Sequence, residues 1–225
     1  MHKKSLIAFF ILMGFVGFSQ INENPTNNYL EDQIYLGFTY NVLNNRPSTI
    51  SPNGFSNGIF IGYIKDIPLS EGRNFGLGLG LGYGRNTYFQ NLKISEINNT
   101  TVFEPVEGTF NRNKFSLHSI EVPFEVRWRT STATKYKFWR LYSGLKLGYV
   151  FASNAKLKQD ITTVVRNISE VNKLQYGLTL SVGYGTWNAN MYYALNDIFS
   201  DAFLSSTGEA IQSREIRIGL IFYIW

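Results

Sequence analysis

Few side chains in this sequence are of a type and spacing that could do chemistry. The 225 residues include no cysteine, which excludes a thiol nucleophile, a disulfide scaffold and a zinc ribbon. Only His118 lies beyond the N-terminal segment among the histidines, with Ser116 and Ser119 close to it in sequence. A catalytic triad also needs an acid that orients the histidine, and a metal site needs further ligands. We therefore predict a protein that is not an enzyme and has no catalytic residue, cofactor or bound metal.

A glycine-rich run at 76–84 superficially resembles a phosphate-binding loop. Its glycines stand at every second position, with Leu77, Leu79, Leu81 and Tyr83 between them. Phosphate loops have irregular glycine spacing and lead into a helix. The strict period of two predicts a β-strand with one apolar face and one glycine face.

The N-terminus has the features of a secretory signal peptide. Lys3 and Lys4 precede an apolar run at 6–18, which is too short to span a bilayer as a helix. Small residues at −3 and −1 predict cleavage between Ser19 and Gln20. We expect a signal peptide at 1–19, a polar periplasmic leader at 20–32 and one domain at 33–225.

Alternation of apolar and small or polar residues recurs through the rest of the chain, whereas helical periodicity is weak. Long and short connections alternate between eight expected strands. This pattern is typical of an eight-stranded antiparallel up-and-down transmembrane β-barrel, with long loops outside and both ends in the periplasm. The expected strands are 34–42, 55–66, 75–83, 120–128, 139–151, 174–184, 187–195 and 215–225.

Alternation also fits a soluble lipocalin-like barrel, in which the apolar residues face inward. Charged residues make up 16% of the chain, below the ~25% usual in soluble domains. A glycine face suits a narrow lumen, and aromatic residues near strand ends suit membrane interfaces. The last strand ends in Tyr223 and Trp225, which resembles the C-terminal signal read by the outer-membrane barrel assembly machinery. We therefore place the chain in the outer membrane of a Gram-negative bacterium.

Charged side chains recur on the predicted lumen face. An eight-stranded barrel is just wide enough to be filled by side chains. We expect a plugged polar lumen with a paired charge network, in which acids and bases face one another across the hairpin of strands 120–128 and 139–151. The phase of the last strand is ambiguous, because both of its faces are apolar. The expected network consists of Glu121, Glu125, Arg127, Arg140, Lys146, Glu215 and Arg217.

Bases alternate with aromatic residues around the turn that follows residue 128. Such interleaving could contact nucleic acid, but at the rim of a membrane barrel it suits lipid phosphates or an acidic partner. We expect contacts with outer-membrane lipid or an envelope protein, and none with nucleic acid. The predicted rim contacts are Arg129, Lys135, Lys137 and Trp139.

Five segments resemble the Bacteroidetes outer-membrane β-barrel proteins known as the porin family or PorT family: 121–132, 136–151, 174–180, 192–199 and 217–224. The resemblance covers nearly all of the chain after the predicted cleavage point. It implies an outer-membrane barrel, and the name PorT belongs to a component of the type IX secretion and gliding machinery. Fold alone does not carry function. We expect a structural or accessory subunit of an envelope complex, for which type IX secretion is one setting. The alternative is a small porin-like channel for ions or small solutes.

Overall fold

The computed structural model describes residues 32–224, except for residues 71, 99 and 131–136. The predicted signal peptide, the Ser19–Gln20 cleavage point, all of the leader but Asp32, and the residues Lys135 and Trp225 lie outside the described part. All eight strands of the barrel lie within the described residues.

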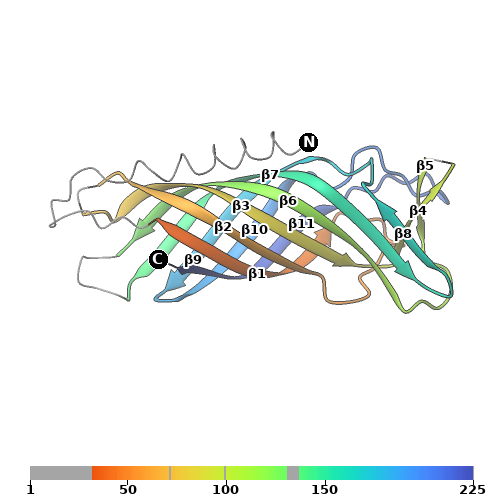
Figure 1. The fold of residues 1–225 in the computed structure, drawn as a ribbon, viewed down its shortest axis with the longest axis horizontal. Helices are drawn as coiled ribbons and strands as arrows, with labels where there is room; N and C mark the ends of the chain where they lie inside the picture. The colour runs from red at the N-terminus through yellow and green to blue at the C-terminus, as the bar shows by residue number, and fades with distance from the viewer. Residues whose placement is uncertain (1–31, 71, 99, 131–136, 225) are drawn as a thin grey trace, which may run out of the picture. The chain divides into compact units, whose positions relative to one another are not determined.

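Eight antiparallel strands close into a barrel, which confirms the predicted fold class (Figure 1). Each barrel strand pairs with the barrel strands before and after it in the chain, and pairing between the first and last strands closes the sheet. The barrel strands are β1 (Gln33–Asn44), β2 (Asn57–Pro68), β3 (Phe75–Phe89), β6 (Arg112–Arg129), β7 (Trp139–Lys158), β9 (Leu174–Tyr184), β10 (Trp187–Asp197) and β11 (Arg214–Ile224).

The long connections contain more regular structure than the sequence predicts. β6 begins eight residues before the predicted start at Ile120, and β7 runs seven residues past the predicted end at Phe151. These extensions lie beyond the apolar part of the wall, so their outward residues are polar and an apolar outward face does not reveal them. A separate hairpin of β4 (Leu92–Ile97) and β5 (Thr100–Pro105) follows β3, and β8 (Thr162–Arg166) pairs with the end of β7.

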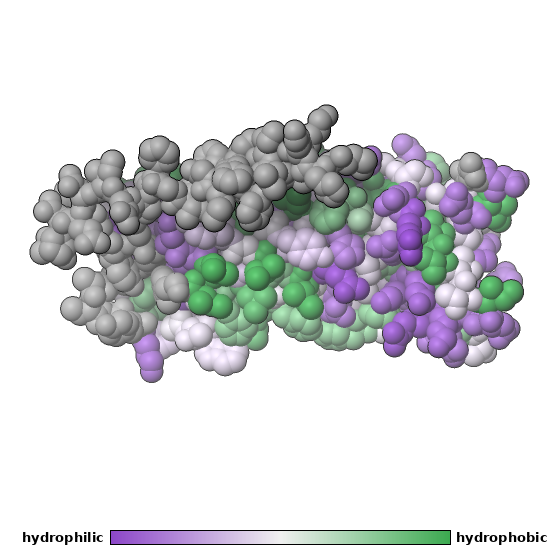
Figure 2. Space-filling view, viewed as in Figure 1, coloured by the Kyte–Doolittle hydropathy of each residue, from purple (hydrophilic) through white to green (hydrophobic). Residues whose placement is uncertain are grey.

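The apolar residues face outward over the middle of the wall. On β9 exposed and buried residues alternate without a break, and Leu178 is 50% exposed. Figure 2 shows hydrophobic side chains gathered over the middle of the barrel and hydrophilic ones over the long-loop end. Within the described residues, no helix has the length and hydropathy needed to cross a membrane. The outward apolar band is the surface that a membrane barrel presents to acyl chains.

Aromatic side chains border this apolar band at both ends. Trp128 and Trp187 are exposed where strands meet the short turns, and Tyr83 and Tyr149 are exposed toward the long loops. On β6 the band therefore runs from Ile120 to Trp128, about the length that a tilted strand needs to span a bilayer. Such rings favour the boundary between acyl chains and head groups.

The glycine face of β3 lines the lumen and makes room for large side chains. A Cβ atom at Gly78 would lie 2.7 Å from Nε of Arg127, and one at Gly82 would collide with the hydroxyl end of Tyr35. A Cβ at Gly82 would also lie 2.8 Å from the carbonyl oxygen of Ile61. The glycines thus let long polar side chains fill an otherwise narrow interior.

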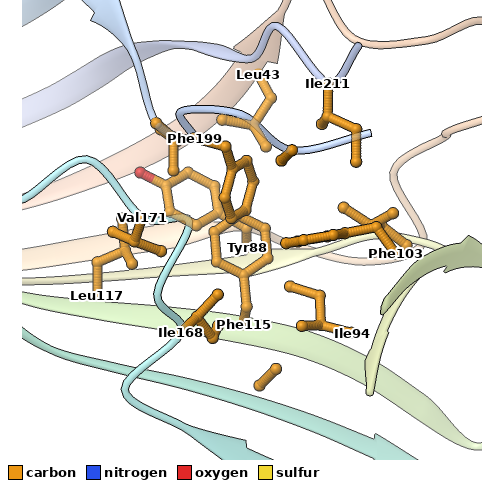
Figure 3. Close-up of a cluster of buried hydrophobic side chains, with 14 of the residues drawn as sticks. Leu43, Tyr88, Ile94, Phe103, Phe115, Leu117, Ile168, Val171, Phe199 and Ile211 are labelled. Atoms are coloured by element: carbon orange, nitrogen blue, oxygen red, sulfur yellow. The ribbon is translucent and has the colours of Figure 1, made fainter. Parts of the chain in front are cut away.

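A hydrophobic cluster closes the long-loop end of the barrel, and we call it the cap (Figure 3). Phe199, from the loop after β10, packs against Phe103 of β5 and Phe115 of β6, with ring centroids 5.5 and 5.4 Å apart. Phe103 also forms a parallel β-bridge with Leu204, which joins two loops. The cap consists of Leu43, Ile50, Tyr88, Leu92, Ile94, Phe103, Phe115, Leu117, Val150, Ala155, Val165, Ile168, Val171, Ile198, Phe199, Ala202, Leu204 and Ile211.

Candidate functional site

The lumen beneath the cap holds two groups of buried ion pairs. The group nearer the short turns is centred on Asp66, at the end of β2. Its carboxylate accepts hydrogen bonds from Nη1 of Arg127 at 3.2 Å and from Nη2 of Arg129 at 2.7 Å. The Glu125 carboxylate accepts a hydrogen bond from Nε of Arg127 at 3.1 Å. All four side chains are at most 8% exposed.

The second group lies nearer the cap and is centred on Glu121. One carboxylate oxygen of Glu121 accepts a hydrogen bond from Nη1 of Arg217 at 2.7 Å. The other lies 3.0 Å from Nζ of Lys146. The Arg217 guanidinium also bonds Glu215 at 2.9 Å, and the Tyr88 hydroxyl donates to the same carboxylate. Because Tyr88 belongs to the cap, this hydrogen bond joins the polar lumen to the apolar cluster above it.

Aromatic rings pack against the cations of both groups. The guanidinium of Arg127 lies 4.4 Å from the ring centroid of Tyr142, and that of Arg217 lies 4.3 Å from the ring of Tyr192. The Lys146 ammonium lies 4.7 Å from the ring of Phe60. A ring face attracts a desolvated cation, so these contacts offset part of the cost of burying the charges.

The free space beside the second group is small. A cavity bordered by Glu121, Lys146 and Arg217 has a volume of about 10 Å³. That is room for roughly one water molecule. The two groups of ion pairs and the cap above them thus occupy much of the described interior.

The structure brings six of the seven predicted lumen residues into the two groups. Glu215 and Arg217 are buried, which settles the ambiguous phase of β11. Arg140 is also buried, but it donates a hydrogen bond to the carbonyl oxygen of Gly185 and lies over the ring of Phe138. The predicted residues in the groups are Glu121, Glu125, Arg127, Lys146, Glu215 and Arg217.

The expected pairing across the β6–β7 hairpin is present for Glu121 and Lys146, but at diagonal rather than directly opposed positions. The residue directly opposite Glu121 is Gly148, and the one opposite Arg140 is Arg129. Glu121 instead reaches Lys146 diagonally on β7, and reaches across the lumen to Arg217 on β11. In a narrow barrel the far wall is within reach of a long side chain, so pairing between adjacent strands is only one of the options.

Sequence reasoning missed two members of the site, Asp66 and Tyr88. Inward residues on β2 include Phe60 and Ile64, so this strand does not alternate cleanly between apolar and polar faces. The signal that marks Asp66 as inward is its even spacing from Gly58 and Gly62. Tyr88 lies beyond the end of the predicted strand at residue 83.

The predicted rim residues separate into two sets. Arg129 was expected on the periplasmic rim, but its side chain is 1% exposed and bonded to Asp66, so it belongs to the lumen. Lys137 is exposed, and Trp139 is 55% exposed with its ring 5.2 Å from that of Tyr184. Alternation from Arg127 carries Arg129 inward, whereas the strand end alone suggested an exposed position.

Of the two residues in the predicted C-terminal assembly signal, Tyr223 and Trp225, the structure describes only Tyr223. Tyr223 points into the lumen, where its ring meets Tyr142 edge-on at 5.7 Å. The outward residues at this end of β11 are Phe222 and Ile224. Trp225 lies outside the described residues.

His118 faces the outer surface of the barrel. Its Nδ1 lies 2.6 Å from the Tyr83 hydroxyl, whereas Ser119 is on the opposite, inward face of β6. Among the residues that the structure describes, no group of histidine, aspartate and glutamate side chains could hold a metal ion.

Together, the closed antiparallel sheet, the outward apolar band and the packed polar lumen define an outer-membrane β-barrel. The family model for the outer membrane protein beta-barrel domain matches residues 18–200, and the chain belongs to this family. Outer-membrane localisation follows from this membership. A search of curated proteins found no match.

Proposed function

We propose that this chain is a non-enzymatic, closed barrel that serves as a structural or accessory subunit of an envelope protein complex. The filled interior carries the proposal. Ion pairs and the cap occupy the lumen and leave about 10 Å³ free beside Glu121. Because its own side chains occupy the described lumen, the outer surfaces are the part of the barrel that we expect to bind other molecules.

The short-turn end offers the surface that best fits a protein partner. Exposed Lys137 lies in the chain just before Trp139, whose ring packs on Tyr184. Trp187 is 65% exposed and meets Phe222 edge-on at 5.4 Å. Exposed aromatic residues such as these are enriched at interface centres. In the proposed topology this end and both termini are periplasmic, and the PorT-family resemblance makes a type IX secretion complex the first setting to test.

The alternative function is a small channel for ions or small solutes. It is favoured only by the polar character of the lumen, because a conducting path would require the Glu121–Lys146–Arg217 contacts to separate. The buried and mutually paired charges oppose such an opening.

A pull-down from native outer membranes tests the accessory role. We expect the tagged protein, extracted in mild detergent after crosslinking, to bring down one or more envelope proteins. The double variant with Lys137→Gln and Trp139→Ala should lose them. The matched variant Tyr149→Ala, which removes a 52% exposed ring at the opposite border of the apolar band, should retain them. A wild-type protein that purifies alone under these conditions would rule out the accessory role.

A further inference from the structure

The outward face of β6 and β7 beyond the apolar band carries like charges directly opposite each other. Arg112 pairs in register with Lys158, and Lys114 pairs with Lys156. Arg112, Lys156 and Lys158 are exposed, and Lys114 is half-buried. Like charges at directly opposed positions destabilise a sheet. Two such pairs in succession are therefore a cost to the fold unless an anion lies over them.

Further cations border these pairs. Arg85 of β3 stands opposite His118 on the same outer face, and Arg166 of β8 stands opposite Asn154, beside Lys156. Within the described part of the chain, no carboxylate forms an ion pair with any of these cations. We call the set the basic face: Arg85, Arg112, Lys114, Lys156, Lys158 and Arg166.

A hollow lies within the basic face. It has a volume of about 340 Å³ and is lined by Asn111 and four of the cations. Partial burial lowers the pKa of Lys114, and the neighbouring charges of Arg85, Arg112 and Lys156 lower it further. The protein thus builds a concave surface with an excess of positive charge. The four cations are Arg112, Lys114, Lys156 and Lys158.

The height of the basic face above the membrane narrows the choice of anion. Arg85 lies level with His118, two residues beyond Ile120, where the apolar band ends on β6. Lys114 and Arg112 lie six and eight residues beyond it. At a rise of about 3.3 Å per residue and a strand tilt of roughly 40°, the cations span about 5 to 20 Å above the band. The head-group layer of an ordinary phospholipid is only about 5–8 Å deep.

We propose that the basic face binds the phosphorylated, acidic saccharide head group of lipopolysaccharide in the outer leaflet. Such a head group carries anions at several heights, which matches the spread of cations on the basic face. The acyl chains of the same lipid would lie against the apolar wall directly below. Arginine and lysine bind phosphate through charge-assisted hydrogen bonds. The inference rests on the outer-membrane location and on the proposed topology, in which the long-loop end lies on the outside of the cell. It does not depend on the accessory role.

The outward direction of these side chains favours a lipid over a soluble partner. The cations point in the same direction as Ile120 and Val122, that is, toward the surrounding membrane. A soluble acidic protein would meet the loops at the end of the barrel before it met this lateral wall.

Native mass spectrometry of the purified full chain in neutral detergent tests the proposal, with rough-type lipopolysaccharide as the probe. The double variant Lys156→Gln with Lys158→Gln should bind this probe about 25-fold more weakly, at the usual contribution of each cation near an anionic lipid surface. The matched control, Lys65→Gln with Lys137→Gln, removes two exposed cations from the short-turn end and should keep the wild-type affinity. Phosphatidylglycerol should bind wild type more weakly than lipopolysaccharide does.

Several results would overturn the proposal. An equal loss in both double variants would show a general charge effect, and equal binding of phosphatidylglycerol would remove the head-group preference. Displacement of lipopolysaccharide by millimolar inorganic phosphate would show a site for the free ion. Without lipid, the Lys156→Gln/Lys158→Gln variant should melt no lower than wild type, because like-charge repulsion is relieved. A lower melting temperature would contradict the premise that these pairs cost stability.

Discussion

Replacing Glu121 by glutamine is expected to destabilise the folded barrel by about 3–5 kcal/mol. The Glu121 carboxylate is the shared acceptor for Lys146 and Arg217, and both cations are nearly inaccessible to water. The variant leaves Lys146 without an acidic partner among the described residues, although its contact with the ring of Phe60 persists. Loss of one partner from a buried pair is costly because the remaining charge stays desolvated.

Unfolding by denaturant in lipid vesicles would measure this loss, with folded protein recognised by its altered mobility on unheated gels. The matched control is Glu104→Gln in the β4–β5 hairpin. Glu104 forms an ion pair of similar length with Lys93, at 2.6 Å, but both side chains are about one-third exposed. An exposed pair contributes at most ~1 kcal/mol. Equal, small effects in the two variants would show that the lumen charges are solvated, contrary to the packed interior described above.

Replacing Phe199 by alanine is expected to destabilise the cap by about 3–5 kcal/mol. Phe199 is 3% exposed and packs against both Phe103 and Phe115. Truncation would leave a cavity at the point where the last long loop joins β5 and β6. The barrel wall should persist, because its strand pairing does not involve this ring.

Limited proteolysis of folded protein in detergent reads out the cap separately from the barrel. In Phe199→Ala the residues between β10 and β11 should be cut much faster than in wild type, while the barrel strands stay protected. The matched control is Phe203→Ala in the same loop, because Phe203 is 53% exposed and its loss should change cleavage little. Unchanged protection of the loop in Phe199→Ala would contradict the assignment of the cap as a packed core.

The sequence predicts the barrel well where its wall meets lipid, since the outward residues are apolar there. On β9 every outward residue is apolar or aromatic, and the predicted bounds 174–184 match the strand. The prediction fails beyond the apolar band. There the outward residues of β6 and β7 include Arg112 and Lys156, so the strands no longer show an apolar outward face.

The sequence predicts the lumen site only in part, because it indicates which residues point inward but not which of them form ion pairs. Inward charge on β6 and β7 is visible from alternation, which identifies Glu121 and Lys146. The partner of each charge depends on contacts between strands that are not adjacent in the sheet, as Arg217 to Glu121 and Arg129 to Asp66 show. Such contacts depend on strand tilt and stagger, which residue types alone do not fix. The sequence does not predict the basic face, because the expected strands 120–128 and 139–151 stop short of it.

Electrical recording from purified, folded protein in planar lipid bilayers tests the closed lumen most directly. The ion pairs around Asp66 and Glu121, together with the cap above them, predict no steady ionic current at any moderate voltage. The folded state of the same sample can be checked by its mobility on unheated gels. Reproducible single-channel steps of constant conductance would contradict the closed barrel and establish the channel function in its place.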